Sequence, residues 1–133
     1  MKLKQDCVRY VLLNLEAQKI ELTFNGANAD QICSVLANDK FSEDDIYYTL
    51  YQLWDGKFID ATVTKVKLGR WPMTVRNLTW KGHELLDNIR DDVVWKKTKE
   101  VTKSFSSVSL NILSNVAANV LTGLVKQASG LNF

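Results

Sequence analysis

The sequence predicts an α+β fold that is mainly helical and carries a small antiparallel β wing. Three observations lead to this prediction. Apolar residues recur at helical spacing in several segments of the 133-residue chain, as on the buried face of amphipathic helices. A β-branched run at residues 58–64 and an alternating run at 73–76 flank turn residues at 69–72, which predicts a hairpin. Helical segments on both sides of this hairpin give the order of a winged helix-turn-helix, here with a C-terminal helical extension.

The first 40 residues predict two helices separated by a short strand. Apolar residues within 8–15 follow i, i+3, i+4, i+7 spacing, so a helix is expected over residues 4–18. Residues 20–24 alternate between apolar and polar types before a turn signal, which predicts a strand that pairs with the hairpin. A second helix is expected to begin at Asn28 or Asp30 and to run to about residue 38, since both residue types cap helices well.

A third helix is predicted to begin at Ser42. Asp45 follows three residues later, which is the spacing of a capping box. The helix is expected to end at Asp55, because Gly56 can adopt the left-handed conformation that terminates helices. Together with the second helix, it forms a helix-turn-helix corner, whose second helix enters the major groove in DNA-binding proteins.

The charges of this third helix argue against direct reading of DNA bases. Residues 43–55 contain four carboxylates and no Lys or Arg, and a phosphate backbone repels such a surface. Carboxylates in a first helical turn have a simpler role, because they stabilise the helix dipole. The candidates for base contacts on this helix are therefore uncharged side chains: Tyr47, Tyr48, Tyr51 and Gln52.

The predicted wing, in contrast, is basic. Residues 57–81 contain six cations and one acid, a net charge of +5, whereas the rest of the chain carries −3 and the whole chain +2. Two interpretations remain open for the hairpin. Its cations contact phosphate, with Trp71 available for stacking, or they protect an exposed sheet edge while Trp71 packs back onto the domain. The candidate phosphate contacts are Lys65, Lys67, Arg70 and Arg76.

The C-terminal third predicts a helical extension with apolar surface to spare. Thr79 and then Asp91 or Asp92 are expected to cap two further helices. We place the winged helix-turn-helix domain at residues 1–90 and an oligomerisation element at 91–133. Residues 104–125 carry no charge and, read as a helix, present a wide apolar face. The residues expected to bury this face against a second copy are Phe105, Ile112, Leu113, Val116, Val120, Leu121 and Leu124.

Two other fates of the uncharged helix stay open. It could fold back and cover the first helix of its own domain. A membrane-spanning role is disfavoured, because three Asn and five Ser among these 22 residues are costly in hydrocarbon. No secretory signal is recognisable at the N-terminus, so a cytoplasmic location is expected.

No catalytic or metal-binding pattern is visible. Cys7 and Cys33 are far apart in the sequence, and neither belongs to a C-x-x-C pair. His83 is the single histidine and has no partner in a recognisable nucleophile or zinc motif. We therefore predict a protein that is not an enzyme and that needs no metal and no cofactor.

Several blocks of the sequence resemble a known family. They read MKLKQDCVR at 1–9, FS at 41–42, LTWKGHELLDNIR at 78–90 and VWKKTK at 94–99. Their order is similar to that of the YjcQ-like winged-helix proteins of Gram-positive bacteria and their prophages, a family catalogued as a domain of unknown function. The resemblance covers nearly the whole chain. It implies a winged-helix fold and a bacterial or phage setting, and no activity.

Two functional hypotheses follow. The first is a DNA-binding regulator of a bacterial or phage element, with duplex DNA as partner and a homodimer formed through the C-terminal helix. The second is a protein-interaction module of a mobile element or defence system, in which the tyrosine-rich helix and the uncharged helix contact other proteins. A membrane-active C-terminal helix is a third, weaker alternative.

Overall fold

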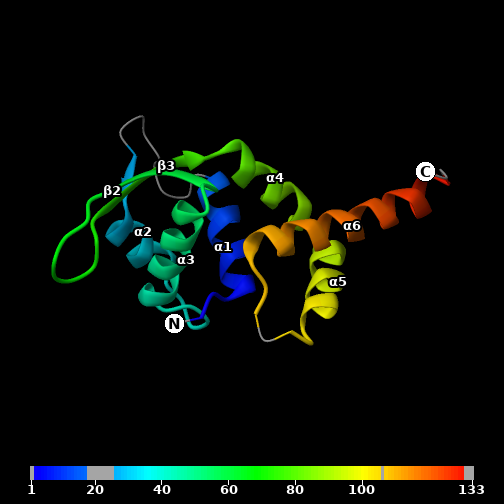
Figure 1. Cartoon of the computed structure of the whole chain (residues 1–133), viewed down its shortest axis with the longest axis horizontal. Coiled ribbons are helices and arrows are strands. Elements are labelled where there is room, and N and C mark those ends of the chain that lie inside the picture. Colours follow the sequence, from blue (N-terminus) through cyan, green and yellow to red (C-terminus); the bar gives the residue numbers. More distant parts are fainter. Residues whose placement is uncertain (1, 18–25, 106, 131–133) are drawn as a thin grey trace. The chain divides into compact units, whose positions relative to one another are not determined.

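The computed structural model describes residues 2–17, 26–105 and 107–130. It confirms the predicted fold class, because these residues form six helices and a three-stranded antiparallel sheet in a winged-helix-like order (Figure 1). The chain divides into two compact units, an N-terminal unit of Met1–His83 and a C-terminal unit of Glu84–Phe133. Each unit is described by itself below.

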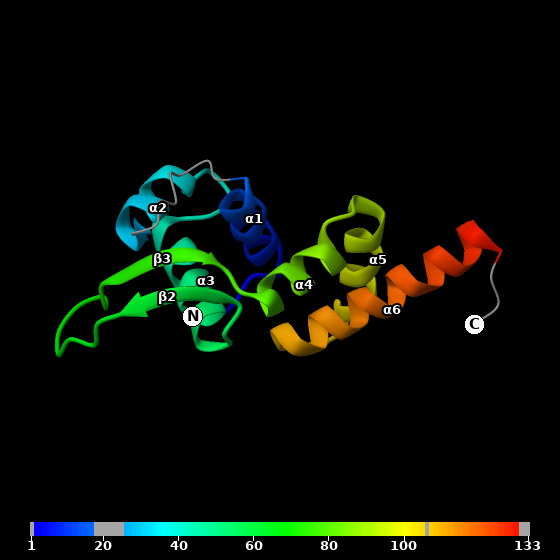
Figure 2. The same cartoon turned by 90° about the horizontal axis from the view of Figure 1, so that it is seen from above.

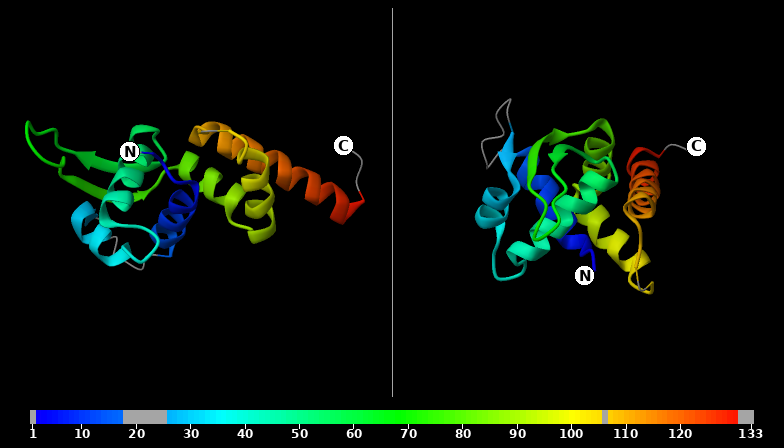
Figure 3. Two further views of the ribbon diagram at one scale, coloured as in Figure 1. Left: turned by 90° about the horizontal axis from the view of Figure 1, so that it is seen from below. Right: turned by 60° about the vertical axis from the view of Figure 1, so that its left-hand side comes forward.

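The N-terminal unit combines three helices, a small sheet and the first turn of a fourth helix. Its elements are α1 (Gln5–Glu16), β1 (Ala27–Asn28), α2 (Ala29–Leu36), α3 (Glu43–Asp55), β2 (Ile59–Val63), β3 (Met73–Leu78) and the start of α4 (Trp80–Ile89). The strand order is β1-β3-β2, with both pairings antiparallel and a bulge at Asp60/Ala61. The predicted hairpin is thereby confirmed. Its loop extends beyond the helices of this unit (Figures 1 and 3).

The core of this unit lies where the sequence periodicity places it. The buried stripe of α1 packs near α3 and β3, while α2 contacts both α3 and the sheet. The fully buried large side chains of this unit are Val8, Val11, Leu12, Ile32, Ile46, Leu50, Leu53 and Val75. These residues hold α3 in a fixed position beside β2, and this position determines which α3 side chains the wing can reach.

Side-chain caps define where three of these helices, α2, α3 and α4, begin. Ser42 and Asp45 form the predicted capping box, in which each side chain accepts a hydrogen bond from the other residue's backbone N–H. Asn28 is the cap of α2. Thr79 Oγ1 accepts a hydrogen bond of 3.1 Å from the Gly82 N–H in the first turn of α4.

α3 ends at Asp55 as predicted, but the conformation expected of Gly56 is wrong. Gly56 has a φ of −82°, and the left-handed residue is instead Lys57, with a φ of 67°. Space explains the glycine, because a Cβ at position 56 would lie 2.8 Å from the Phe58 ring. The strand predicted at residues 20–24 lies outside the described residues, and the strand that pairs with β3 is β1.

The C-terminal unit is helical. It contains the rest of α4, then α5 (Asp92–Thr102) and α6 (Leu110–Ser129), which pack on each other (Figure 2). Asp91 caps α5, and Ser109 caps α6. α6 begins at Leu110, later than the start of the uncharged stretch at residue 104. The cause is Ser109, whose side chain accepts a hydrogen bond from the N–H of Ile112 and so caps the helix. Within the residues that the structure describes, no helix combines the length and apolar character needed to cross a membrane.

Candidate nucleic-acid interface

The loop between β2 and β3, residues 64–72, is called the wing tip here. It is closed by its own hydrogen bonds. The Trp71 Nε1–H donates to the Val66 carbonyl at 3.1 Å, and the Thr64 N–H donates to the Pro72 carbonyl at 2.9 Å. The Lys65 Nζ lies 5.6 Å from the centre of the Trp71 ring, within cation–π range. The half-buried indole thus packs against its own loop and restricts the conformations that the wing tip can take.

Two tyrosines of α3 attach the wing tip to the helix. The Tyr47 hydroxyl donates a hydrogen bond of 2.6 Å to the Trp71 carbonyl. The Tyr51 ring meets the Trp71 ring edge-on, with 5.9 Å between the ring centres. Burial raises the pKa of the Tyr47 hydroxyl, so it stays protonated and able to donate. Together with Gly69 and Arg70, these three aromatic residues line a hollow of about 280 Å³, named the aromatic hollow.

Arg70 is committed to partners within the chain. Its guanidinium pairs with the carboxylate of Asp44 in the first turn of α3, and with that of Asp30 in α2 at 3.5 Å. The same group lies 4.6 Å from the centre of the Tyr47 ring. Arg70 therefore compensates part of the acidic end of α3, and a contact with phosphate would require its guanidinium to leave these carboxylates.

Arg76 is also engaged, on the hairpin itself. Its Nε donates to Asp60 at 3.0 Å, and one terminal nitrogen donates to the Thr62 hydroxyl at 2.8 Å. Both partners lie on β2, the neighbouring strand. This contact is a cross-strand pair, of the kind that stabilises two-stranded ribbons.

The lysines of the wing tip behave differently. Lys65 and Lys67 are exposed, and neither forms an ion pair with any residue of the described chain. Leu68, next to them, is 90% exposed. The structure therefore separates the four predicted phosphate contacts into two internally paired arginines and two lysines open to solvent.

The four predicted base-contact residues separate in a similar way. Tyr47 and Tyr51 face the wing tip and line the aromatic hollow, while Tyr48 and Gln52 are half-buried and do not line it. The partner that sequence reasoning missed is Asp30. Its ion pair with Arg70 joins residues 40 positions apart, and no local pattern announces such a contact.

An ion pair between Lys4 and the titratable carboxylate of Asp45 holds the amino end of α3. Lys4 Nζ donates to the Asp45 carboxylate at 3.0 Å. The hydrogen bond from Lys4, and then the one from the Ser42 backbone, hold the pKa of Asp45 below its usual value. This carboxylate links the start of α1 to the start of α3.

We expect Asp45→Ala to lower the free energy of unfolding by about 1 kcal/mol near pH 7. A carboxylate whose pKa is depressed by folding contributes stability above its unfolded pKa of about 3.9, and this stability is lost as the pH falls through the folded value. The difference from wild type should therefore shrink below pH ~4. Urea unfolding at several pH values measures it. Glu43→Gln, in the same helical turn, is the control and should cost less.

The residues predicted to mediate oligomerisation occupy different environments. Leu113 is buried within the chain, and Phe105 precedes α6 and is 65% exposed. Ile112 is 52% exposed on α6. The remaining four are half-buried: Val116, Val120, Leu121 and Leu124.

The cysteines are enclosed in the core. Cys7 and Cys33 are fully buried free thiols, and desolvation raises the pKa of Cys33 to about 12. A thiol held in this protonated form is a poor nucleophile. Among the described residues, no group of three His, Cys, Asp or Glu side chains is placed to hold a metal ion.

The fold and the wing define a winged-helix-like α+β protein. A family model described as Hypothetical protein (DUF2513) matches residues 2–109, and the chain belongs to this family. It is also 31% identical over 128 residues to an uncharacterized protein of Haemophilus influenzae, and the match covers 94% of this chain and 99% of the relative. No solved structure matches. The similarity to the YjcQ-like family stays a prediction.

Proposed function

We propose that this protein binds duplex DNA through its wing tip, and that it does so as a dimer joined through its C-terminal helix. The observation that carries the proposal is the placement of Lys65 and Lys67. Both are exposed on a loop that contains no carboxylate, and the loop is restrained by the Trp71 hydrogen bond to Val66. Restrained lysines can approach a phosphate backbone without first breaking an internal ion pair.

The role of α3 is revised in this proposal. Tyr47, Tyr51 and Arg70 orient the wing tip, and Arg70 reduces the negative charge that the acidic turn of α3 would present to DNA. Tyr48 and Gln52 remain as candidate base contacts on α3. With so few groups available to read bases, we expect binding that depends mainly on phosphate contacts and varies little with sequence.

The salt dependence of binding tests the wing. For wild-type protein, affinity for a short duplex should fall steeply with salt, because each phosphate contact releases counterions. Replacing Lys65 and Lys67 with glutamine should reduce the slope of log affinity against log salt by about two, or roughly one for each lysine. Fluorescence anisotropy of a labelled duplex between low and physiological salt measures both slopes.

The matched control makes the same charge change on α5 and at the residue that follows it. Lys96 and Lys103 are exposed lysines outside the wing, so their double glutamine variant should keep the wild-type slope. A wild-type protein that fails to bind duplex at low salt would contradict the proposal. An equal loss of slope in the wing and control variants would show that binding is not centred on the wing.

A protein partner is the second candidate, and one observation favours it. The aromatic hollow is lined by Tyr47, Tyr51, Trp71 and Arg70, and Tyr, Trp and Arg are the residue types that dominate binding energy at protein interfaces. This alternative would gain if the folded protein showed no affinity for duplex at low salt.

A further inference from the structure

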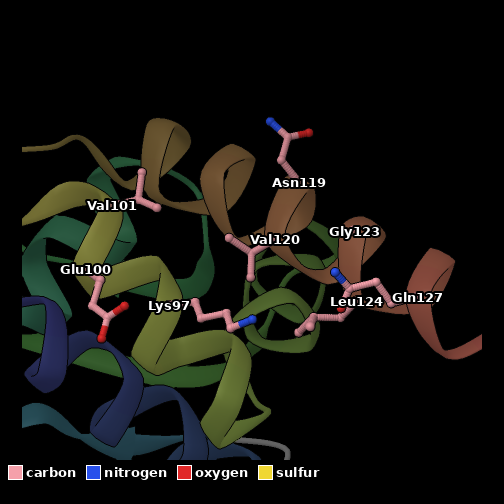
Figure 4. A pocket seen from close by; sticks show the side chains of 8 residues that line it. All are labelled: Lys97, Glu100, Val101, Asn119, Val120, Gly123, Leu124 and Gln127. Atoms are coloured by element: carbon pink, nitrogen blue, oxygen red, sulfur yellow. The ribbon is translucent and has the colours of Figure 1, made fainter.

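The C-terminal unit contains a groove that the proposed DNA contact does not use. It lies between α5 and α6 and has a volume of about 480 Å³ (Figure 4). We call it the α5–α6 groove. The residues that line it are Lys97, Glu100 and Val101 from α5, and Asn119, Val120, Gly123, Leu124 and Gln127 from α6.

The lining combines an apolar surface with one charge of each sign. Val120 and Leu124 are half-buried, and Val101 is 53% exposed. Lys97 and Glu100 lie three positions apart on α5 and are both exposed. Neither takes part in an ion pair within the described part of the chain. Two opposite charges beside an exposed valine and a half-buried leucine therefore have no ion-pair partner among the residues that the structure describes.

The α6 side of the groove adds no charge and little obstruction. Its polar lining residues, Asn119 and Gln127, are uncharged. Gly123 leaves the helix backbone bare, since a Cβ placed there would meet no other atom within 4 Å. Another helix can therefore approach α6 closely at this point.

We infer that a second copy of this chain occupies the α5–α6 groove. In a twofold contact, if residue i meets residue j of the other copy, residue j also meets residue i. With the two α5 helices antiparallel across the axis, Lys97 of each copy faces Glu100 of the other. The dimer then contains two equivalent ion pairs between the copies. A patch with one charge of each sign has no net charge with which to attract a strongly charged partner, but it complements itself.

This inference rests on the assembly half of the proposed function and makes it specific. It adds three α5 residues to the interface, Lys97, Glu100 and Val101. It keeps Val120 and Leu124 from the predicted α6 face and leaves Phe105 and Leu113 outside. The contact becomes a surface formed by two helices, with charges that set its orientation.

Charge reversal on the full chain tests it. Lys97→Glu leaves two acids in the groove of each copy, and Glu100→Lys leaves two lysines. Like charges then face each other across the contact, so each variant should dimerise at least about tenfold more weakly than wild type. The double variant restores opposite charges and should return close to the wild-type dissociation constant. A mixture of the two single variants should form a heterodimer. Sedimentation velocity measures all four states, and circular dichroism verifies folding.

The control is Lys96→Glu, which reverses an exposed charge on α5 outside the groove and should leave dimerisation unchanged. If wild type dimerises but the single variants do so equally well, the inference is wrong and the dimer uses another face. The same holds if the mixed variants form no heterodimer. If wild type stays monomeric at concentrations on the order of 100 μM, the assembly half of the proposed function fails as well. DNA binding by the wing is measured separately.

Discussion

Replacing Gly82 with alanine is expected to lower the free energy of unfolding of the N-terminal unit by about 3 kcal/mol. A Cβ at this position would lie 1.9 Å from the backbone oxygen of Phe58, far inside van der Waals contact. That oxygen cannot rotate away, because it accepts a hydrogen bond of 3.0 Å from the Thr79 N–H. The first turn of α4 would have to separate from the chain that enters β2.

The measurement is the midpoint of urea unfolding, monitored by circular dichroism. Gly123→Ala, measured at protein concentrations where the chain is monomeric, is the matched control, since it makes the same change inside α6 where the new methyl group meets no atom of its own chain within 4 Å. There the substitution should stabilise the helix by up to about 1 kcal/mol, because alanine loses less conformational freedom than glycine. A Gly82→Ala protein that unfolds at the wild-type midpoint would contradict the close approach of α4 and Phe58.

Leu50→Ala is expected to cost about 2–5 kcal/mol. Leu50 is completely buried in α3, and α3 packs against α1, α2 and β2. Removing most of the side chain leaves a cavity among elements that cannot all move inward. Val35→Ala on α2, where the side chain is 55% exposed, should change stability by less than about 0.5 kcal/mol. The urea midpoints of the two variants give the comparison, and similar losses would contradict the placement of Leu50 in the core.

The parts of the fold that could be predicted from the sequence depend on neighbouring residues. The capping box of Ser42 and Asp45 and the cap from Thr79 to Gly82 each span three positions. The hairpin follows from β-branched runs on either side of turn residues. In each case the physical cause and its structural result lie within one short segment, so a pattern in the sequence is enough.

The internal pairing of the wing could not be predicted in this way. Arg70 meets Asp44 across 26 positions and Asp30 across 40, because α2 and α3 approach the wing only after folding. From the sequence, Arg70 and Lys67 look equivalent as phosphate contacts. The structure distinguishes them by the acids that lie within reach of each.

The C-terminal helix shows a second limit. Helical periodicity correctly marks an apolar face, but it does not say which part of the face the protein covers itself. Leu113 and Ala117 are buried, whereas Ile112 is 52% exposed. The apolar pattern also begins before α6 does. Phe105 fits the helical periodicity, but it precedes Ser109, the residue that caps α6.

The arginines and the lysines of the hairpin differ in their contacts. Its arginines, Arg70 and Arg76, act as cross-links, and a phosphate that captured Arg70 would leave Asp30 and Asp44 without compensation. A planar guanidinium suits such fixed, multiple contacts, while an ammonium on a flexible stem suits a changing target. A lysine at position 70 would therefore keep the charge and lose the bracing. Under the proposed function, the internal contacts of the wing and its contacts with phosphate belong to separate residues, so each property can change without the other.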